Sequence, residues 1–387
     1  MTKLPITPRR ILFWIHLWIG LPLCMVLAVI GVTGSILVFA HEIEALMHPE
    51  LHHASNGPAK PVAEIVAATR GAAPEGATPS FYSAPESPGD PAVVRFMPPG
   101  RTQPAPGGIQ VMVDPAILEV LGSREGETFS RQVEMLHANL TIRDRSGRDI
   151  VGWLGVAMLV LGATGLVLHW PKPGRWKAAF QVTRRARGIR LMRELHGMVG
   201  IWGLVVFMIV SFSGVYLAFP QATSSVVGVV LPAKDLRAAS NQFKATPIPQ
   251  GKRIEVDQAV TLAQSQVPGA LRAVFFPGRP DQPYRVMLSR PGANDGGPPA
   301  TIFVDPWSAK VLGIQDPKDY SAGETMLAWQ RPLHAGDGLG WPWRILVFLS
   351  GLMPVVFAIT GIWMWVLKRR AGRLVRRSSL AATKAAE

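Results

Sequence analysis

The sequence has very little cysteine: Cys24 is the only one in 387 residues, which excludes a disulfide framework. No Cys-x-x-Cys-His segment occurs, so covalent attachment of a c-type haem is excluded as well. There is also no Gly-x-Gly-x-x-Gly before a helix and no Walker loop, and the chain therefore shows no nucleotide site. If the protein handles electrons, its reductant must come from a partner or from a quinone.

Acidic residues are scarce, 26 against 40 Lys and Arg, and the basic residues are unevenly placed. Three short segments, 1–10, 171–193 and 368–387, hold 18 Lys/Arg and one acid. The rest of the chain holds 22 basic and 25 acidic residues. This distribution is typical of the positive-inside rule rather than of nucleic-acid binding, and it predicts that the three segments are cytoplasmic. A nucleic-acid partner is therefore not expected.

Long apolar runs make up much of the chain, which is 48% hydrophobic with a mean hydropathy of +0.21. Four runs are long enough to cross a bilayer as helices, and the first is too long for a cleaved signal peptide. We therefore predict a multi-pass protein of the bacterial inner membrane with both termini in the cytoplasm and its large loops in the periplasm. The expected parts are transmembrane helices within 1–40, 150–170, 194–219 and 343–367, periplasmic units at 41–149 and 220–342, a cytoplasmic loop at 171–193 and a cytoplasmic tail at 368–387.

The stretch from Arg9 to Phe39 is repeated in outline from Arg190 to Phe219. In each copy a histidine lies 17 residues before a hydroxyl-glycine pair and 23 residues before a phenylalanine. The matched positions are His16 and His196, Thr33-Gly34 and Ser213-Gly214, and Phe39 and Phe219. Later, VDP followed by VLG occurs at 109–122 and again at 300–313, and a Leu-His pair ends a predicted helix at His137 and at His334. These matches predict an internal tandem repeat in parallel orientation.

Each large loop has the pattern of a small α+β unit. The predicted helices are Val62–Arg70 and Val256–Val267, and alternating apolar residues predict the strands. The strands expected in the first unit are Val93–Met97 and Ile109–Val113, and those in the second are Ala273–Phe276, Tyr284–Leu288 and Thr301–Val304. The fold class predicted is a four-helix transmembrane bundle with two periplasmic α+β units.

Histidines are the candidate functional residues, and they fall at two depths. His16, His169 and His196 lie near the cytoplasmic ends of the predicted spans, while His137 and His334 lie at the periplasmic surface in equivalent places of the two repeats. Paired imidazoles from facing helices are the usual axial ligands of a b-type haem. Two such clusters, separated by roughly the bilayer thickness of ~30 Å, suit a two-haem electron path.

Several alternatives stay open at this point. The histidines could instead be interfacial, or partners of Glu194 and Asp337. Three cytoplasmic-side histidines are one too many for one haem, and the sequence does not choose between His16 and His169 as the partner of His196. All four spans also bear a Thr-Gly or Ser-Gly pair, which serves either helix packing or the entry of a flat macrocycle. His48, His52 and His53 form a cluster that could bind metal, with a solvated loop as the alternative.

The sequence resembles the PepSY-associated transmembrane helix family, in particular its inner-membrane ferric-siderophore reductases. The resemblance runs from about Arg9 to Lys368 and rests on the first helix, on the Leu-His before the second helix and on His169-Trp170-Pro171. The segment VDQAVTLAQSQVPGALRAVFFPG at 256–278 is similar to the soluble PepSY unit, and 62–99 is similar more loosely.

The resemblance implies an enzyme with two b-type haems that passes electrons across the membrane to a periplasmic ferric siderophore or other ferric chelate, releasing Fe²⁺. His137 and His334 would hold the outer haem, and His196 with His16 or His169 the inner one. The electron donor would be a quinone or a cytoplasmic reductase. Two alternatives are a membrane-anchored PepSY module that binds or restrains a protease without redox activity, and a siderophore transporter. The mid-span residues are apolar and include no acid or lysine, which disfavours the transporter.

Overall fold

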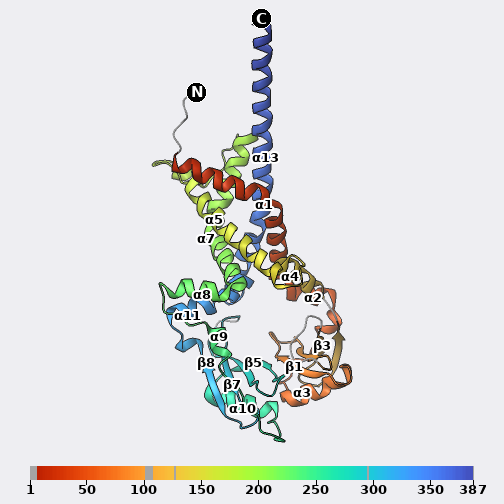
Figure 1. Cartoon of the computed structure of the whole chain (residues 1–387). Helices are drawn as coiled ribbons and strands as arrows, with labels where there is room; N and C mark the ends of the chain where they lie inside the picture. The colour runs from red at the N-terminus through yellow and green to blue at the C-terminus, as the bar shows by residue number, and fades with distance from the viewer. Residues whose placement is uncertain (1–6, 101–107, 126–127, 294–295, 387) are drawn as a thin grey trace.

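The computed structural model describes residues 7–100, 108–125, 128–293 and 296–386, with side chains described as far as Arg373. Residues 1–6 of the predicted cytoplasmic N-terminus, and Glu387 at the end of the predicted tail, lie outside the described residues. The chain forms a bundle of long helices joined at one end to a β-sheet (Figure 1). The described chain begins with α1 and finishes with α13 at the other end of the bundle (Figure 1).

Four helices in the described chain are long and apolar enough to cross a membrane, which confirms the predicted helical membrane bundle. α1 packs against α13 and α5, and α7 packs against α5 and α13. α5, α7 and α13 begin before their predicted starts at 150, 194 and 343, α1 begins within its predicted range of 1–40, and α13 continues well past the predicted end at 367. The four are α1 (Pro8–Val38), α5 (Arg145–His169), α7 (Gly188–Ala218) and α13 (Gly340–Ala386).

The two extramembrane units share one antiparallel sheet of eight strands in the order β4-β3-β2-β1-β5-β6-β7-β8. The halves join where β1 pairs with β5, with Phe81 opposite Phe275. The predicted strands are present, while β1, β4 and β8 were not expected from the sequence. The strands are β1 (Thr78–Ser83), β2 (Ala92–Met97), β3 (Ile109–Val113), β4 (Val120–Arg124), β5 (Ala270–Phe275), β6 (Tyr284–Ser289), β7 (Ala300–Val304) and β8 (Val311–Gln315).

One face of the sheet is covered by α3 (Val62–Thr69) and α10 (Val256–Gln266), which together with the sheet enclose a single hydrophobic core. Alternate strand residues point into this core, as the pleat of a strand requires; Val94 and Val286 have no exposed surface. Asp257 of α10 accepts hydrogen bonds from the Val62 and Ala63 amides at 2.8 and 3.1 Å. Since a carboxylate is favourable at a helix N-terminus, Asp257 ties the two helices together.

Short helices link the sheet to the bundle, and two of them carry the predicted Leu-His pairs. The first predicted helix is α4 (Phe129–Asn139), and the second is divided at Trp329 into α11 (Ala322–Ala328) and α12 (Gln330–Ala335). The other short helices are α2 (Ala40–Met47), η1 (Pro49–Leu51), η2 (Arg70–Ala72), α6 (Trp176–Ala179), α8 (Pro220–Gly228), α9 (Leu236–Ser240) and η3 (Pro317–Asp319).

Candidate cofactor site in the membrane bundle

His137 of α4 and His334 of α12 face each other at the end of the bundle next to the sheet. Their ring centres lie 5.9 Å apart, with the ring planes at 51°. The two residues come from helices almost two hundred positions apart in the chain, so the pair exists only in the folded protein. The structure therefore places these two residues side by side, as expected from the sequence.

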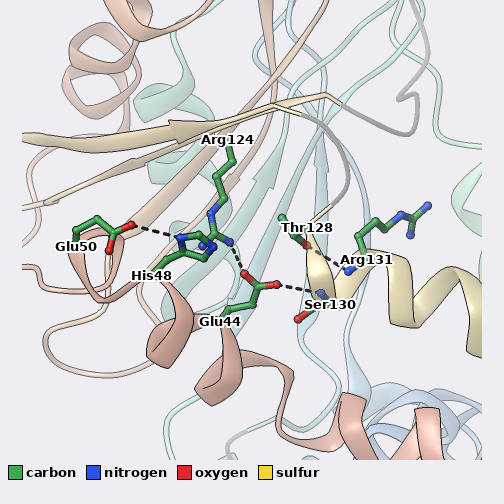
Figure 2. Close-up of polar contacts among 7 residues, drawn as sticks. All are labelled: Glu44, His48, Glu50, Arg124, Thr128, Ser130 and Arg131. Carbon is green, nitrogen blue, oxygen red and sulfur yellow. Dashed lines mark hydrogen bonds and ion pairs between the residues drawn. The ribbon is translucent and has the colours of Figure 1, made fainter.

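The position of α4, and so of His137, is fixed by polar contacts at its first turn (Figure 2). Thr128 caps the helix by accepting the Arg131 amide at 3.2 Å. Glu44 of α2 accepts the Ser130 amide at 3.0 Å and forms an ion pair with Arg124 of β4. Partial burial raises the pKa of Glu44, but these hydrogen bonds outweigh it and the net shift is downward, so Glu44 stays charged at neutral pH.

Each ring of this outer pair is held through Nδ1 by the neighbouring membrane helix. His137 Nδ1 lies 2.9 Å from the Ile30 carbonyl oxygen and 3.3 Å from Thr33 Oγ1 of α1. His334 Nδ1 lies 3.0 Å from the Val210 carbonyl oxygen and 2.9 Å from Ser213 Oγ of α7. A carbonyl oxygen can only accept, so Nδ1 must carry the proton in both rings. The lone pair of each neutral ring is therefore on Nε2.

His16 of α1 and His196 of α7 form a second pair, near the other end of the bundle, with ring centres 6.2 Å apart. His16 Nδ1 lies 2.9 Å from Thr164 Oγ1 of α5, and His196 Nδ1 lies 2.8 Å from Thr360 Oγ1 of α13. Both hydroxyls already donate their single proton to a carbonyl one turn earlier. They must therefore accept from the imidazoles, which again places the proton on Nδ1 and the lone pair on Nε2.

The four hydroxyl-glycine pairs thus each serve one histidine, a role that was not predicted from the sequence. The hydroxyl residue accepts from Nδ1, and the glycine beside it leaves room for the ring in three of the four cases: Gly34 lies against His137, Gly214 against His334 and Gly165 against His16. Gly361 has no neighbour within 4 Å of an added Cβ. The signal available in the sequence was the recurrence of the hydroxyl-glycine pair in all four spans, whereas the 17-residue spacing joins His16 to Thr33, which contacts His137 instead.

Among the described residues no ring contact joins His169 to His196, whose ring lies beside that of His16. The Nε2 of His169 lies 3.0 Å from the carbonyl oxygen of Ala179 in α6, so Nε2 carries the proton there. Its other nitrogen, Nδ1, lies against Gly197, where an added Cβ would collide with it. Nε2 of His169 is therefore hydrogen-bonded and its Nδ1 edge is packed against α7, and the geometry favours His16 as the residue opposite His196.

The two acidic residues that could have paired with the histidines lie elsewhere. Glu194 accepts from Arg190 at 2.8 Å and from the Thr183 amide at 2.8 Å. In the described part of the chain, no hydrogen bond or ion pair joins Glu194 to His196 or Asp337 to His334. The four paired histidines are instead held by hydroxyl and carbonyl oxygens.

The predicted cluster of His48, His52 and His53 does not converge on one point. His48 contacts Glu50 at 3.3 Å, whereas the ring of His52 packs against His41 with ring centres 5.6 Å apart. Within the residues that the structure describes, no group of three or more His, Cys, Asp or Glu side chains is arranged to hold a metal ion.

A cavity of about 740 Å³ surrounds the outer histidine pair. Residues of all four membrane helices line it, including Ile30 of α1, Leu154 of α5, Phe207 of α7 and Pro354 of α13. Its volume lies within the range of about 300–1,000 Å³ that is usual for cofactor and ligand sites. The cavity is apolar inside the bundle and polar towards the sheet, where Arg95 and Gln110 reach it.

The donor set fits a bis-histidine haem. Two imidazoles that bind one metal ion from opposite sides, each at about 2 Å, have ring centres about 6 Å apart. Both pairs, at 5.9 and 6.2 Å, have this separation. Burial lowers the pKa of His137, and burial together with the nearby His137 lowers the pKa of His334 to about 4, so the outer pair is neutral at pH 7. Neutral imidazole is the form that ligates iron.

Comparison with known proteins agrees with this architecture. The family described as the PepSY-associated TM region matches residues 13–368. The chain is also 25% identical over 262 residues to the uncharacterized protein PA4219 of Pseudomonas aeruginosa. That match covers 60% of this chain and 64% of the relative, so slightly less than two thirds of the relative's length is spanned. With nearly its whole length matched, the chain belongs to the PepSY-associated TM family of membrane proteins.

Proposed function

We propose that this protein is a di-haem b-type reductase of the bacterial inner membrane, which reduces ferric iron held by a siderophore or another chelate in the periplasm. In this proposal the chain is an internal tandem repeat in parallel orientation, and the sheet, built from two PepSY-like units, faces the periplasm. His137 and His334 hold the outer haem, and His16 and His196 hold the inner one.

The observation that carries the proposal is the arrangement of the four histidines. Each has its Nδ1 proton bound by an oxygen of a neighbouring helix, and none of the hydrogen bonds described above for these four residues uses their Nε2. Hydrogen bonding of one imidazole nitrogen fixes the tautomer and ring orientation of a metal-binding histidine. Haem iron, when bound, would supply one-electron redox chemistry. The chain's own contribution is to orient the imidazoles and to enclose the outer pair in an apolar cavity.

The two pairs are separated along the bundle by a length suited to a membrane. His16 and Thr33, which holds His137, lie 17 residues apart on the same helix. At 1.5 Å per residue, this places the pairs about 26 Å apart along α1, close to the hydrocarbon thickness of about 30 Å. Electrons entering at the inner pair would therefore leave near the sheet.

The direction of transfer follows from the charge distribution. The basic segments 171–193 and 368–387 lie at the end of the bundle away from the sheet, which the positive-inside rule assigns to the cytoplasm. The reaction is the reduction of chelated Fe³⁺ to Fe²⁺ by one electron, drawn from a quinol or a reduced cytoplasmic protein. Because Fe²⁺ carries less charge, hard oxygen ligands hold it less tightly and the iron is released.

The test is the visible spectrum of the full chain, purified in mild detergent after expression with added haem. We expect sharp bands on reduction by dithionite and about two haems per chain by the pyridine haemochrome assay. The double variant His137→Ala/His334→Ala should lose one haem and His16→Ala/His196→Ala the other. Adding a ferric chelate under nitrogen should reoxidise the reduced wild-type protein and form Fe²⁺, detected with a ferrous-specific dye. A protein that is colourless under these conditions would contradict the proposal and favour a PepSY binding module without redox activity.

A further inference from the structure

The mouth of the cavity around the outer histidine pair is strongly basic. It is lined by Arg95 of β2, Arg131 of α4, Arg148 of α5 and Arg331 of α12, with Glu134 as the one acidic residue among the described lining residues. Glu134 is paired with Arg131 at 2.8 Å. The lining therefore has a net charge of +3, from four arginines and one glutamate. The other three arginines make no ion pair or hydrogen bond through their guanidinium groups within the described chain.

Arg95 is the member of this group that the sheet itself holds in place. It lies on the face opposite the hydrophobic core, with its guanidinium carbon 5.5 Å from the centre of the Phe81 ring. Arg95 is only partly exposed, and this burial together with the charge of Arg131 lowers its pKa. A guanidinium that is partly desolvated and has no carboxylate partner is costly to keep. Arg95 lines the cavity, where an anionic ligand would satisfy its donors.

The second half of the sheet contains a near-equivalent arginine that does not line the cavity. Arg285 of β6 lies 4.1 Å from the Phe275 ring centre, and Phe275 is paired with Phe81 across the β1–β5 junction. Arg95 has Gln110 of β3 opposite it, and Gln110 lines the cavity. Arg285 instead has Phe303 of β7 opposite it, and Phe303 is covered by Phe243. The sheet is thus open to the cavity on the first half, and Arg285 provides a matched control for Arg95.

We propose that this mouth binds an anionic ferric chelate, whose carboxylate or phenolate oxygens accept hydrogen bonds from Arg95, Arg148 and Arg331. The inference rests on the proposed function and names its substrate class. Guanidinium groups bind such oxygens in a bidentate manner, and a cleft of one charge sign concentrates ligands of the other. The arginines surround the cavity that contains His137 and His334, so a chelate bound there is next to the outer histidine pair.

The experiment measures binding without electron transfer. The full chain, in nanodiscs of zwitterionic phosphatidylcholine, is equilibrated by dialysis with ⁵⁵Fe as ferric citrate, which is anionic, or as a cationic ferric trihydroxamate. We expect ferric citrate to bind at least about tenfold more tightly than the cationic complex, and to weaken as salt is raised. Arg95→Gln should weaken citrate binding about tenfold, Arg331→Gln by a similar factor, and Arg95→Lys by less. Arg285→Gln should change it less than about twofold.

Three results would overturn the inference. One is equal binding of the anionic and the cationic chelate. Another is an equal loss of citrate binding in Arg95→Gln and Arg285→Gln, which would indicate a general charge effect. The third is a loss of haem in Arg95→Gln with citrate binding unchanged, which would assign the arginine to haem propionates. Because haem content is read separately from the spectrum, a colourless protein that still binds citrate would reject the reductase function and leave the anion site standing.

Discussion

Gly34 lies directly against the imidazole ring of His137: a Cβ added to Gly34 would be 2.9 Å from His137 Cε1. The same relationship occurs in the second half, where a Cβ on Gly214 would be 3.1 Å from His334 Cε1. A contact under 3.0 Å cannot be accommodated without movement, and the ring is held from the other side by Ile30 and Thr33. The glycines are therefore part of the histidine site.

The first prediction concerns Gly34→Ala. The added methyl group should push the His137 ring away from the Ile30 carbonyl and out of line with His334. We expect the variant to lose most of the outer haem, with a fall in affinity of about 10–100-fold, as is usual when the orientation of a metal ligand is disturbed. Haem content and the reduced spectrum measure this. Gly361→Ala is the matched control, because nothing lies within 4 Å of its added Cβ, and it should keep both haems.

Much of the membrane architecture could be predicted from the sequence. The four spans were predictable because runs of about 20 consecutive apolar residues rarely occur outside membrane helices. The pairing of His137 with His334 was predictable because both residues end a Leu-His phrase at matching places of the repeat expected from the sequence. The hydrogen bonds that the two rings donate to Thr33 and Ser213 were not predictable, since they depend on which helix packs against which. Thr33 holds a histidine that lies 104 residues further along the chain.

The single sheet could not be predicted from the sequence. β1 has the sequence TPSFYS, in which apolar and polar residues alternate poorly, so its pairing potential is not visible. Its partner β5 lies in the other half of the chain, and the two join through the register Phe81 to Phe275. β4 and β8, the two edge strands, both begin with the VLG phrase. The sequence showed this phrase to be repeated, but it did not show that the phrase forms a strand. Strand pairing between distant segments is a tertiary property that local patterns do not encode.

A second prediction separates His169 from His16. Because Nε2 of His169 is hydrogen-bonded to the Ala179 carbonyl and its ring packs on Gly197, His169→Ala should retain two haems. The lost hydrogen bond should cost about 1 kcal/mol of stability. His16→Ala should retain only the outer haem. Pyridine haemochrome assays of the two variants measure the difference, and one haem in His169→Ala with two in His16→Ala would reverse the assignment.

A third prediction tests the role of the hydroxyl groups. Thr164→Val keeps the shape of the side chain but removes the acceptor for His16 Nδ1. The proton on Nδ1 then loses its hydroxyl acceptor and the ring is held less firmly, so we expect the inner haem to be lost about 10–100-fold more readily. Thr164→Ser retains the hydroxyl and should behave as the wild type. Haem retention during extended dialysis against apomyoglobin measures the loss; equal retention in Val and Ser variants would show that the hydroxyl only packs.

The last prediction concerns the repeated VDP phrase, whose aspartates organise the turn after β3 and after β7. Asp114 is almost fully buried and accepts amide hydrogens from Ser55 at 2.5 Å and from Ala116 at 2.9 Å. Burial acts to raise its pKa, but these hydrogen bonds outweigh burial and the pKa of Asp114 is lowered in the folded protein. A lowered folded-state pKa stabilises the fold above the ordinary value of 3.8, and the contribution is lost as the pH falls below it.

Asp114→Asn should therefore lower the stability of the sheet by about 2 kcal/mol at pH 7 and by less at pH 3. Hydrogen–deuterium exchange of the β3 amides at both pH values measures this, and an equal loss at both would mean that the charge of Asp114 is not what stabilises the turn.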